Sequence, residues 1–147
     1  VVVTNQAGVA RGYYTEDDVK ELHRYMNELL AGQGVKIDAF YYCPHHPEHG
    51  IGKYKVRCHC RKPETGMFEM AEQDFAVDKA SSWMIGDKLI DMEAGRNYGV
   101  RTVLVGTGYG AGVHEEQKKK GDFPYDLYAD DLLEAYNEIN RETAGNL

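Results

Sequence analysis

Long hydrophobic runs are missing from this 147-residue chain, and cysteine, proline and tryptophan are scarce. No apolar run approaches the ~20 residues that a helix needs to cross a bilayer, so we expect no contact with a membrane. The three cysteines are an odd number, which argues against a framework of disulfides. The first residues lack the charged start and the cleavage site of a signal peptide, so we expect a cytoplasmic protein with reduced thiols.

Positive charge is in the minority, with 17 Lys and Arg residues against 24 Asp and Glu residues and a net charge of −7. This balance argues against a nucleic acid as the main partner. Cations are nevertheless concentrated in one short stretch, which contains Lys53, Lys55, Arg57, Arg61 and Lys62. The stretch would suit a small anion such as a phosphate ester, and a solvated basic loop is the alternative.

All three cysteines lie in one stretch, together with a histidine at ligand spacing. The pair Cys43 and His45 is followed by the pair Cys58 and Cys60. Three thiolates and one imidazole form the ligand set of a closed tetrahedral zinc site, so we predict a structural zinc in loop 43–60. Three unrelated buried cysteines are the alternative. Other histidines that could replace a ligand are His46, His49 and His59.

Apolar strands and amphipathic helices alternate along the chain. Strands are predicted over residues 1–3, 35–42, 82–85, 100–105 and 126–129. Helices are predicted over 16–31 (after an N-cap at Thr15), 65–75, 89–97 and 131–140, and a solvated turn over 118–120. This alternation predicts one α/β domain over residues 1–147, with a parallel sheet between helices on both faces.

Polar residues and glycines gather where the predicted strands end, and ligands of such sheets bind at the carboxyl ends of the strands. Asp87 could hold Mg²⁺ beside a phosphate there, although aspartate is also a common N-cap. Thr4 and Asn5 could donate hydrogen bonds to phosphoryl oxygens, or could be ordinary turn residues. Lys62 carries a compact charge that suits the neutralisation of a phosphoryl group.

The order of Thr4, Lys62 and the Gly86-Asp87-x-x-x-Asp91 pattern resembles motifs two, three and four of the haloacid dehalogenase-type phosphatases. The run from Thr4 to Gly12 and the Cys/His loop before Arg61-Lys62-Pro63 resemble, within that family, the phosphatases of D-glycero-D-manno-heptose 1,7-bisphosphate. The histidinol-phosphate phosphatases share the zinc loop and are the alternative. The resemblance extends from Val1 to about Gly112.

The resemblance implies a three-layer Rossmann-like fold in which the zinc loop replaces a large cap. It also implies a monomeric, Mg²⁺-dependent hydrolase that removes the 7-phosphate of a sugar phosphate during synthesis of a lipopolysaccharide core precursor. Thr4 would steady the phosphoryl oxygens, Lys62 would neutralise them, and Asp87 would hold Mg²⁺. Substrate contacts would come from Asn5, Gln6, Ala7, Arg61 and Lys88. Zinc would be held by Cys43, His45, Cys58 and Cys60.

The family's first motif is an Asp-x-Asp pair on a central strand that precedes Thr4, and it supplies the nucleophile and the general acid. No Asp-x-Asp occurs in the 147 residues; Asp17-Asp18 and Asp130-Asp131 are adjacent pairs at predicted helix starts. We therefore expect the motif and its strand in a segment upstream of Val1, and the 147 residues alone to be inactive. The alternative is a non-catalytic fragment that contains zinc and binds phosphate.

Overall fold

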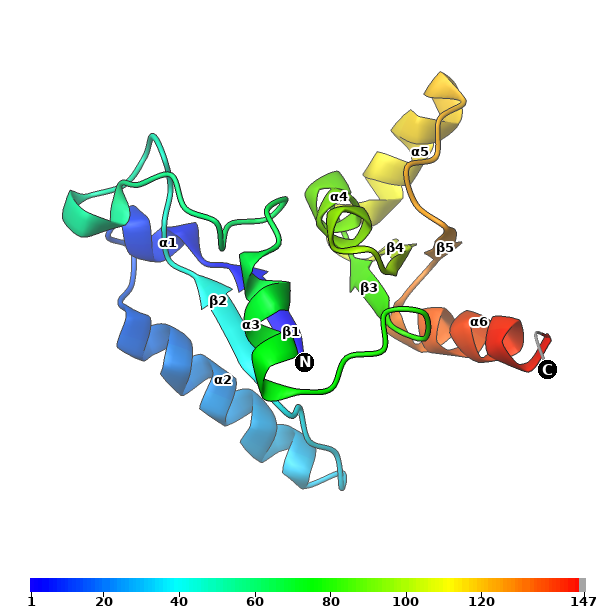
Figure 1. The fold of residues 1–147 in the computed structure, drawn as a ribbon, viewed down its shortest axis with the longest axis horizontal. Helices are drawn as coiled ribbons and strands as arrows, with labels where there is room; N and C mark the ends of the chain where they lie inside the picture. The colour runs from blue at the N-terminus through cyan, green and yellow to red at the C-terminus, as the bar shows by residue number, and fades with distance from the viewer. Residues whose placement is uncertain (146–147) are drawn as a thin grey trace. The chain divides into compact units, whose positions relative to one another are not determined.

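A computed structural model describes residues 1–145 as an α/β protein with parallel strands (Figure 1). The chain divides into two compact units, of which the first is Val1–Ala76 and the second begins at Val77. Each unit has its own parallel sheet, so the α/β class is confirmed, whereas a single domain over 1–147 stays a prediction. Within residues 1–145, no helix has the length and apolar character that a bilayer crossing requires.

The first unit is a two-stranded parallel sheet between helices. Its elements are β1 (Val2–Asn5), α1 (Ala7–Ala10), α2 (Glu16–Ala31), β2 (Phe40–Cys43), a 3₁₀ turn η1 (Gly52–Tyr54) and α3 (Gly66–Asp74). Side chains of β2 alternate between the two faces, as the period of a strand requires. Phe40 stacks on His23 of α2, whereas Tyr41 and Cys43 pack against Met67 and other residues of α3. The predicted cover of helices on both faces is confirmed in this unit.

The start of α2 follows from its sequence. Thr15 accepts a hydrogen bond from the Asp18 N–H at 3.2 Å, and the Asp18 carboxylate accepts one from the Thr15 N–H at 2.8 Å. This capping box satisfies two backbone donors that a helix start would otherwise leave unpaired. The helix ends before Gly32, and Gly34 takes the left-handed conformation with a φ of 71°. The predicted N-cap and the predicted helix end are both confirmed.

The predicted strand over 35–42 is wrong in its first half, because β2 begins only at Phe40. Asn27 of α2 explains the difference, since its side chain pairs with the backbone of Ile37. The Asn27 oxygen accepts from the Ile37 N–H at 2.8 Å, and the Asn27 amide donates to the Ile37 carbonyl at 3.0 Å. The backbone N–H and carbonyl of Ile37 are therefore bonded to a helix side chain and are not available to a neighbouring strand.

The second unit is a three-stranded parallel sheet in the order β3-β4-β5. Its elements are β3 (Trp83–Gly86), α4 (Leu89–Tyr98), β4 (Arg101–Val105), α5 (Gly110–Lys120), β5 (Leu127–Ala129) and α6 (Leu132–Gly145). Val103 and Val105 pack with Ala135 of α6, whereas Leu104 packs with Met92 of α4. The central strand β4 is thus buried on both faces, as is typical of parallel sheets.

The predicted solvated turn at 118–120 is wrong, because these lysines form the last turn of α5. Cations are favoured at the C-terminus of a helix, where the helix dipole is negative. Gly121 then ends the helix in the left-handed conformation, with a φ of 68°. Helix α6 also extends past its predicted end, to Gly145, and the elements α1, η1 and α5 were not predicted.

His23 makes the stability of the first unit depend on pH. It is buried between α2 and β2, with its ring 4.4 Å from the ring of Phe40, and burial lowers the pKa of its imidazole. The cations Lys20 and Arg24 and the polar Tyr42 line the adjoining cavity. Below the unfolded pKa of about 6.5 the unfolded chain takes up a proton that the native state resists, so stability falls as pH falls.

We expect the free energy of unfolding in urea to decrease between about pH 7.5 and about pH 5.5. The variant His23→Phe keeps the stacked ring and removes the titrating group, so it should lose less stability over the same interval. Equal losses in the two proteins would contradict a role of His23.

Candidate functional site

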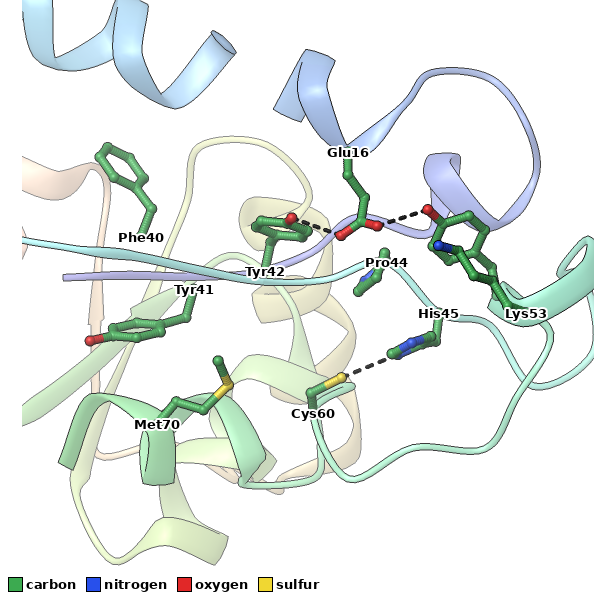
Figure 2. A pocket seen from close by; sticks show the side chains of 10 residues that line it. Glu16, Phe40, Tyr41, Tyr42, Pro44, His45, Lys53, Cys60 and Met70 are labelled. Atoms are coloured by element: carbon green, nitrogen blue, oxygen red, sulfur yellow. Dashed lines mark hydrogen bonds between the residues drawn. The ribbon is translucent and has the colours of Figure 1, made fainter. Parts of the chain in front are cut away.

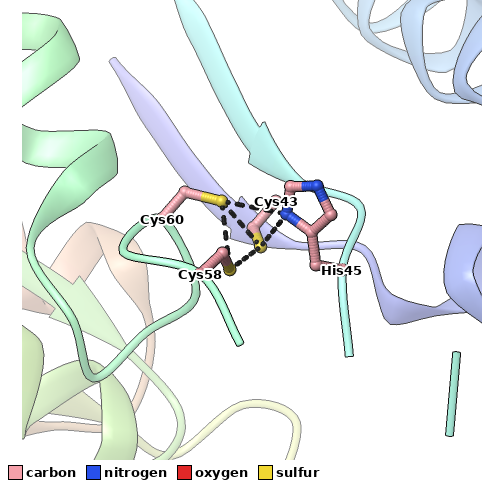
Figure 3. A group of neighbouring side chains, drawn as sticks. All are labelled: Cys43, His45, Cys58 and Cys60. Atoms are coloured by element: carbon pink, nitrogen blue, oxygen red, sulfur yellow. Dashed lines mark hydrogen bonds between the residues drawn. The ribbon is translucent and has the colours of Figure 1, made fainter. Parts of the chain in front are cut away.

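The four predicted zinc ligands lie together in the first unit, with their donor atoms within 4.8 Å of one another (Figure 3). The Sγ atom of Cys43 lies 3.0 Å from that of Cys60 and 3.4 Å from that of Cys58. The Nδ1 atom of His45 lies 3.4 Å from Cys60 Sγ and 3.7 Å from Cys43 Sγ. A tetrahedral zinc with Zn–S bonds of about 2.3 Å has ligand edges of about 3.8 Å, so a small expansion would accommodate the ion.

The chemistry of the donor set also fits zinc. Burial raises the pKa of the Cys43 thiol and of the Cys60 thiol. Deprotonation of these thiols therefore requires a cation that compensates the negative charge. Zinc binding favours the deprotonated thiolate and would offset the cost of burial. The cluster therefore fits a structural zinc, with four protein ligands and no open position.

The other histidines of the loop have different partners. His59 is exposed, and its Nε2 atom lies 2.9 Å from the Glu69 carboxylate, which raises the pKa of His59. The Nδ1 atom of His46 accepts hydrogen bonds from the N–H groups of Glu48 and His49. His45 is therefore the histidine that completes the set of ligands, as the spacing predicts.

Close backbone contacts fix the loop that carries the ligands. The N–H of Gly66, at the start of α3, donates to the His59 carbonyl at 2.9 Å. A Cβ atom at Gly66 would lie 2.5 Å from that carbonyl oxygen, so only glycine allows α3 to start this close to the loop. On the other side of the loop, the Ile51 N–H donates to the Ala10 carbonyl at 2.8 Å.

A cavity of about 460 Å³ lies beside the zinc cluster, and His45 and Cys60 are part of its wall (Figure 2). The Glu16 carboxylate accepts hydrogen bonds from the hydroxyls of Tyr54 at 2.7 Å and Tyr42 at 2.8 Å. These two bonds lower the pKa of Glu16, and the bond from Tyr54 has the larger effect. The first turn of α2 is thereby bonded to β2 and to the 3₁₀ turn of the zinc loop.

Lys62 and Asn5 are brought together, as predicted for neighbouring strand ends. The Asn5 side chain accepts from the Lys62 N–H at 2.9 Å and donates to the Lys62 carbonyl at 3.2 Å. The Lys62 ammonium donates to the Val3 carbonyl at 2.9 Å, and the side chain is only 8% exposed. Asn5, predicted as a substrate contact, thus uses its amide to hold the backbone of Lys62.

Thr4 and Gln6 form a chain of hydrogen bonds that ends at an unpredicted residue. The Gln6 amide donates to the Thr4 hydroxyl oxygen at 3.0 Å, and the Tyr14 hydroxyl donates to the Gln6 side-chain oxygen at 2.6 Å. Tyr14 lies just after the run from Thr4 to Gly12, and no pattern in the sequence marks it. Ala7, another predicted substrate contact, is the first residue of α1.

Arg61 has an unpaired donor. Its Nη1 atom is buried, and no hydrogen-bond partner for it occurs among the described residues. A buried guanidinium donor without a protein partner is available for an anionic ligand. The role of Arg61 in substrate recognition stays a prediction.

Asp87 and Lys88 lie in the second unit, directly after β3. Lys88 is the N-cap residue of α4, and the buried Asp91 carboxylate accepts from the Lys88 N–H at 3.1 Å. Asp91 therefore caps the helix, and Asp87 is not its N-cap.

The Asp87 Oδ2 atom accepts from the Tyr109 N–H at 3.0 Å. Oδ1 of Asp87 accepts no hydrogen bond from the described residues, and a carboxylate oxygen is a ligand that Mg²⁺ prefers. Thr4 and Lys62 belong to the first unit, so their convergence with Asp87 stays a prediction.

Several known proteins are similar to this chain. A family model described as HAD-hydrolase-like matches residues 59–135. The D-glycero-alpha-D-manno-heptose-1,7-bisphosphate 7-phosphatase of Burkholderia mallei is 50% identical over 105 residues, which are 71% of this chain and 56% of the relative. The D-glycero-beta-D-manno-heptose-1,7-bisphosphate 7-phosphatase of Haemophilus ducreyi is 48% identical over 124 residues, which are 83% of this chain and 66% of the relative.

A solved structure is also similar, that of D,D-heptose 1,7-bisphosphate phosphatase from B. bronchiseptica in complex with magnesium and phosphate. Its TM-score is 0.78 at 31% identity, with 97% of this chain and 74% of that chain covered. The chain spans 56% and 66% of the length of the two curated relatives. The parallel α/β fold, the matched family model and these similarities together show that the chain belongs to the HAD-like hydrolase family.

Proposed function

We propose that the protein is a Mg²⁺-dependent phosphatase that removes the 7-phosphate of D-glycero-D-manno-heptose 1,7-bisphosphate, a precursor of the lipopolysaccharide core. The observation that carries the proposal is the arrangement of Lys62, which Asn5 holds beside the end of β1 next to Thr4. The two curated relatives, at 48–50% identity, are both named as phosphatases of this sugar bisphosphate. One is named for the alpha and the other for the beta anomer, so the proposal covers both.

In the proposed reaction an aspartate carboxylate attacks the phosphorus, and the bond between phosphorus and the sugar oxygen breaks. A second carboxyl group gives its proton to the departing oxygen, and water then hydrolyses the aspartyl-phosphate to inorganic phosphate. The 147 residues contain no Asp-x-Asp pair. We therefore assign both carboxyl groups to a segment outside these residues.

The residues of this chain would bind and neutralise the phosphate. Lys62 offers an ammonium group that suits the negative charge of the phosphoryl oxygens, and Thr4 offers a hydroxyl donor. Asp87, together with a carboxylate outside these residues and the phosphate itself, would hold Mg²⁺. When bound, the ion would supply further positive charge at the phosphoryl oxygens.

The zinc cluster would have a structural role only. The ligands Cys58 and Cys60 directly precede Arg61 and Lys62 in the sequence. A zinc ion bound to them would fix the backbone from which both cations project, without taking part in the reaction.

The proposed substrate is tested by comparing phosphate release from the heptose bisphosphate and from histidinol phosphate, with the full-length protein and Mg²⁺. We expect kcat/KM to be higher for the heptose bisphosphate, because the unpaired donor of Arg61 suits a ligand with a second phosphate. A preference for histidinol phosphate would assign the protein to the alternative activity, and release from neither would favour a non-catalytic fragment that binds phosphate.

A further inference from the structure

Tyr109 contacts both of the functional residues predicted in the second unit. It is the N-cap residue of α5, and its backbone N–H donates to Asp87 Oδ2 at 3.0 Å. Its ring faces Lys88, the residue that follows Asp87, and the Lys88 Nζ atom lies 4.7 Å from the ring centroid. One residue thus holds a carboxylate with its backbone and an ammonium group with its side chain.

The backbone around Tyr109 allows little variation. Gly108 is left-handed, with a φ of 62°, and a Cβ atom there would lie 2.2 Å from Asp87 Oδ2. At Gly110 a Cβ atom would lie 1.6 Å from the Val105 carbonyl oxygen. Both positions require glycine, so the Gly-Tyr-Gly segment is pressed against Asp87 and the end of β4. This backbone fixes the position of the Tyr109 Cα atom, from which the ring reaches the Lys88 ammonium.

The exposure of the ring argues against a role in the core. Tyr109 is 67% exposed, and Lys88 is exposed as well. An aromatic ring at such a position contributes little to the burial of apolar surface. Its contact with a cation, in contrast, restricts where a long and flexible side chain can lie.

We infer that Tyr109 is a positioning residue that holds the Lys88 ammonium over its ring, ready to contact the phosphorylated sugar. The inference rests on the proposed function, in which Lys88 contacts the substrate. Without the ring, Lys88 has to be ordered from many rotamers when the substrate binds, which weakens binding and leaves the chemical step unchanged. The bond from the Tyr109 N–H to Asp87 belongs to the backbone and survives replacement of the side chain.

The test compares Tyr109→Leu, which lacks the ring, with Tyr109→Phe, which keeps it. In the full-length protein with Mg²⁺, we expect Tyr109→Leu to raise KM by about 2- to 5-fold with kcat unchanged, and Tyr109→Phe to keep the wild-type KM. Introducing Tyr109→Leu into Lys88→Met should produce no further change, because the two side chains act as one unit. The matched control is Tyr136→Leu in α6, whose tyrosine is 61% exposed and lies outside the proposed machinery.

A second measurement does not depend on activity. In NMR spectra of the wild-type protein, the ε-methylene protons of Lys88 should be shifted upfield by the ring of Tyr109. We expect this shift to persist in Tyr109→Phe and to vanish in Tyr109→Leu. If Tyr109→Leu leaves both KM and the Lys88 shift as in the wild type, the inference is wrong. If the shift behaves as expected but neither the wild-type protein nor any variant hydrolyses the substrate, the proposed function is wrong, whereas the contact between Tyr109 and Lys88 is confirmed.

Discussion

Replacing Cys60 by serine is expected to abolish zinc binding and to destabilise the first unit severely. The donor atoms of Cys43, His45, Cys58 and Cys60 lie within 4.8 Å of one another, which is the largest concentration of ligating groups among residues 1–145. Zinc contributes about 10–16 kcal/mol of apparent binding free energy in small zinc-dependent peptides, and serine is a far weaker ligand than thiolate. We therefore expect the melting temperature to fall by at least about 10 °C.

The measurement is the zinc-to-protein ratio by elemental analysis, together with a thermal unfolding curve. The wild-type protein should contain one zinc per chain and Cys60→Ser almost none. The matched control is His59→Ala, because His59 lies in the same loop but faces Glu69 instead of the cluster. A Cys60→Ser protein with full zinc content, or a His59→Ala protein without zinc, would contradict the assigned ligands.

Replacing Lys62 by methionine is expected to reduce kcat by about 100- to 1000-fold, since a single electrostatic contact to a transition state commonly contributes that much. Methionine keeps most of the length of the buried side chain and removes its charge and its hydrogen bond to the Val3 carbonyl. The Lys62 N–H and carbonyl would stay bonded to Asn5, so the backbone should remain in place.

Zinc content and melting temperature show whether the Lys62→Met protein is folded. The control for a general effect of charge is Lys20→Met, which removes an exposed lysine of α2. A folded Lys62→Met protein with the wild-type kcat would show that Lys62 does not neutralise the phosphoryl group.

Local patterns with a strong physical cause were predictable from the sequence. The zinc ligands follow from two short cysteine and histidine pairs, and the start of α2 follows from Thr15 and the acidic residues after it. Parallel strands covered by helices follow from the alternation of the two kinds of segment. In each case the chemistry of neighbouring residues determines the structure.

Features that depend on contacts between distant residues were not predictable. Strand β2 is shorter than its apolar pattern indicates, because Asn27 bonds to the backbone of Ile37 ten positions away. Asn5 is hydrogen-bonded to the backbone of Lys62, which lies 57 positions later, so no local pattern in the sequence indicates this contact. The contacts of Tyr109 with Asp87 and Lys88 likewise arise only when two loops of the second unit meet.

The central claim is tested most directly by ³¹P NMR of D-glycero-D-manno-heptose 1,7-bisphosphate incubated with the full-length protein. We predict that, with Mg²⁺ present, the signal of the 7-phosphate disappears, the signal of the 1-phosphate remains, and inorganic phosphate appears. Without Mg²⁺ the spectrum should not change. Loss of the 1-phosphate instead, or no release of phosphate by a folded protein that contains zinc and Mg²⁺, would contradict the proposed function.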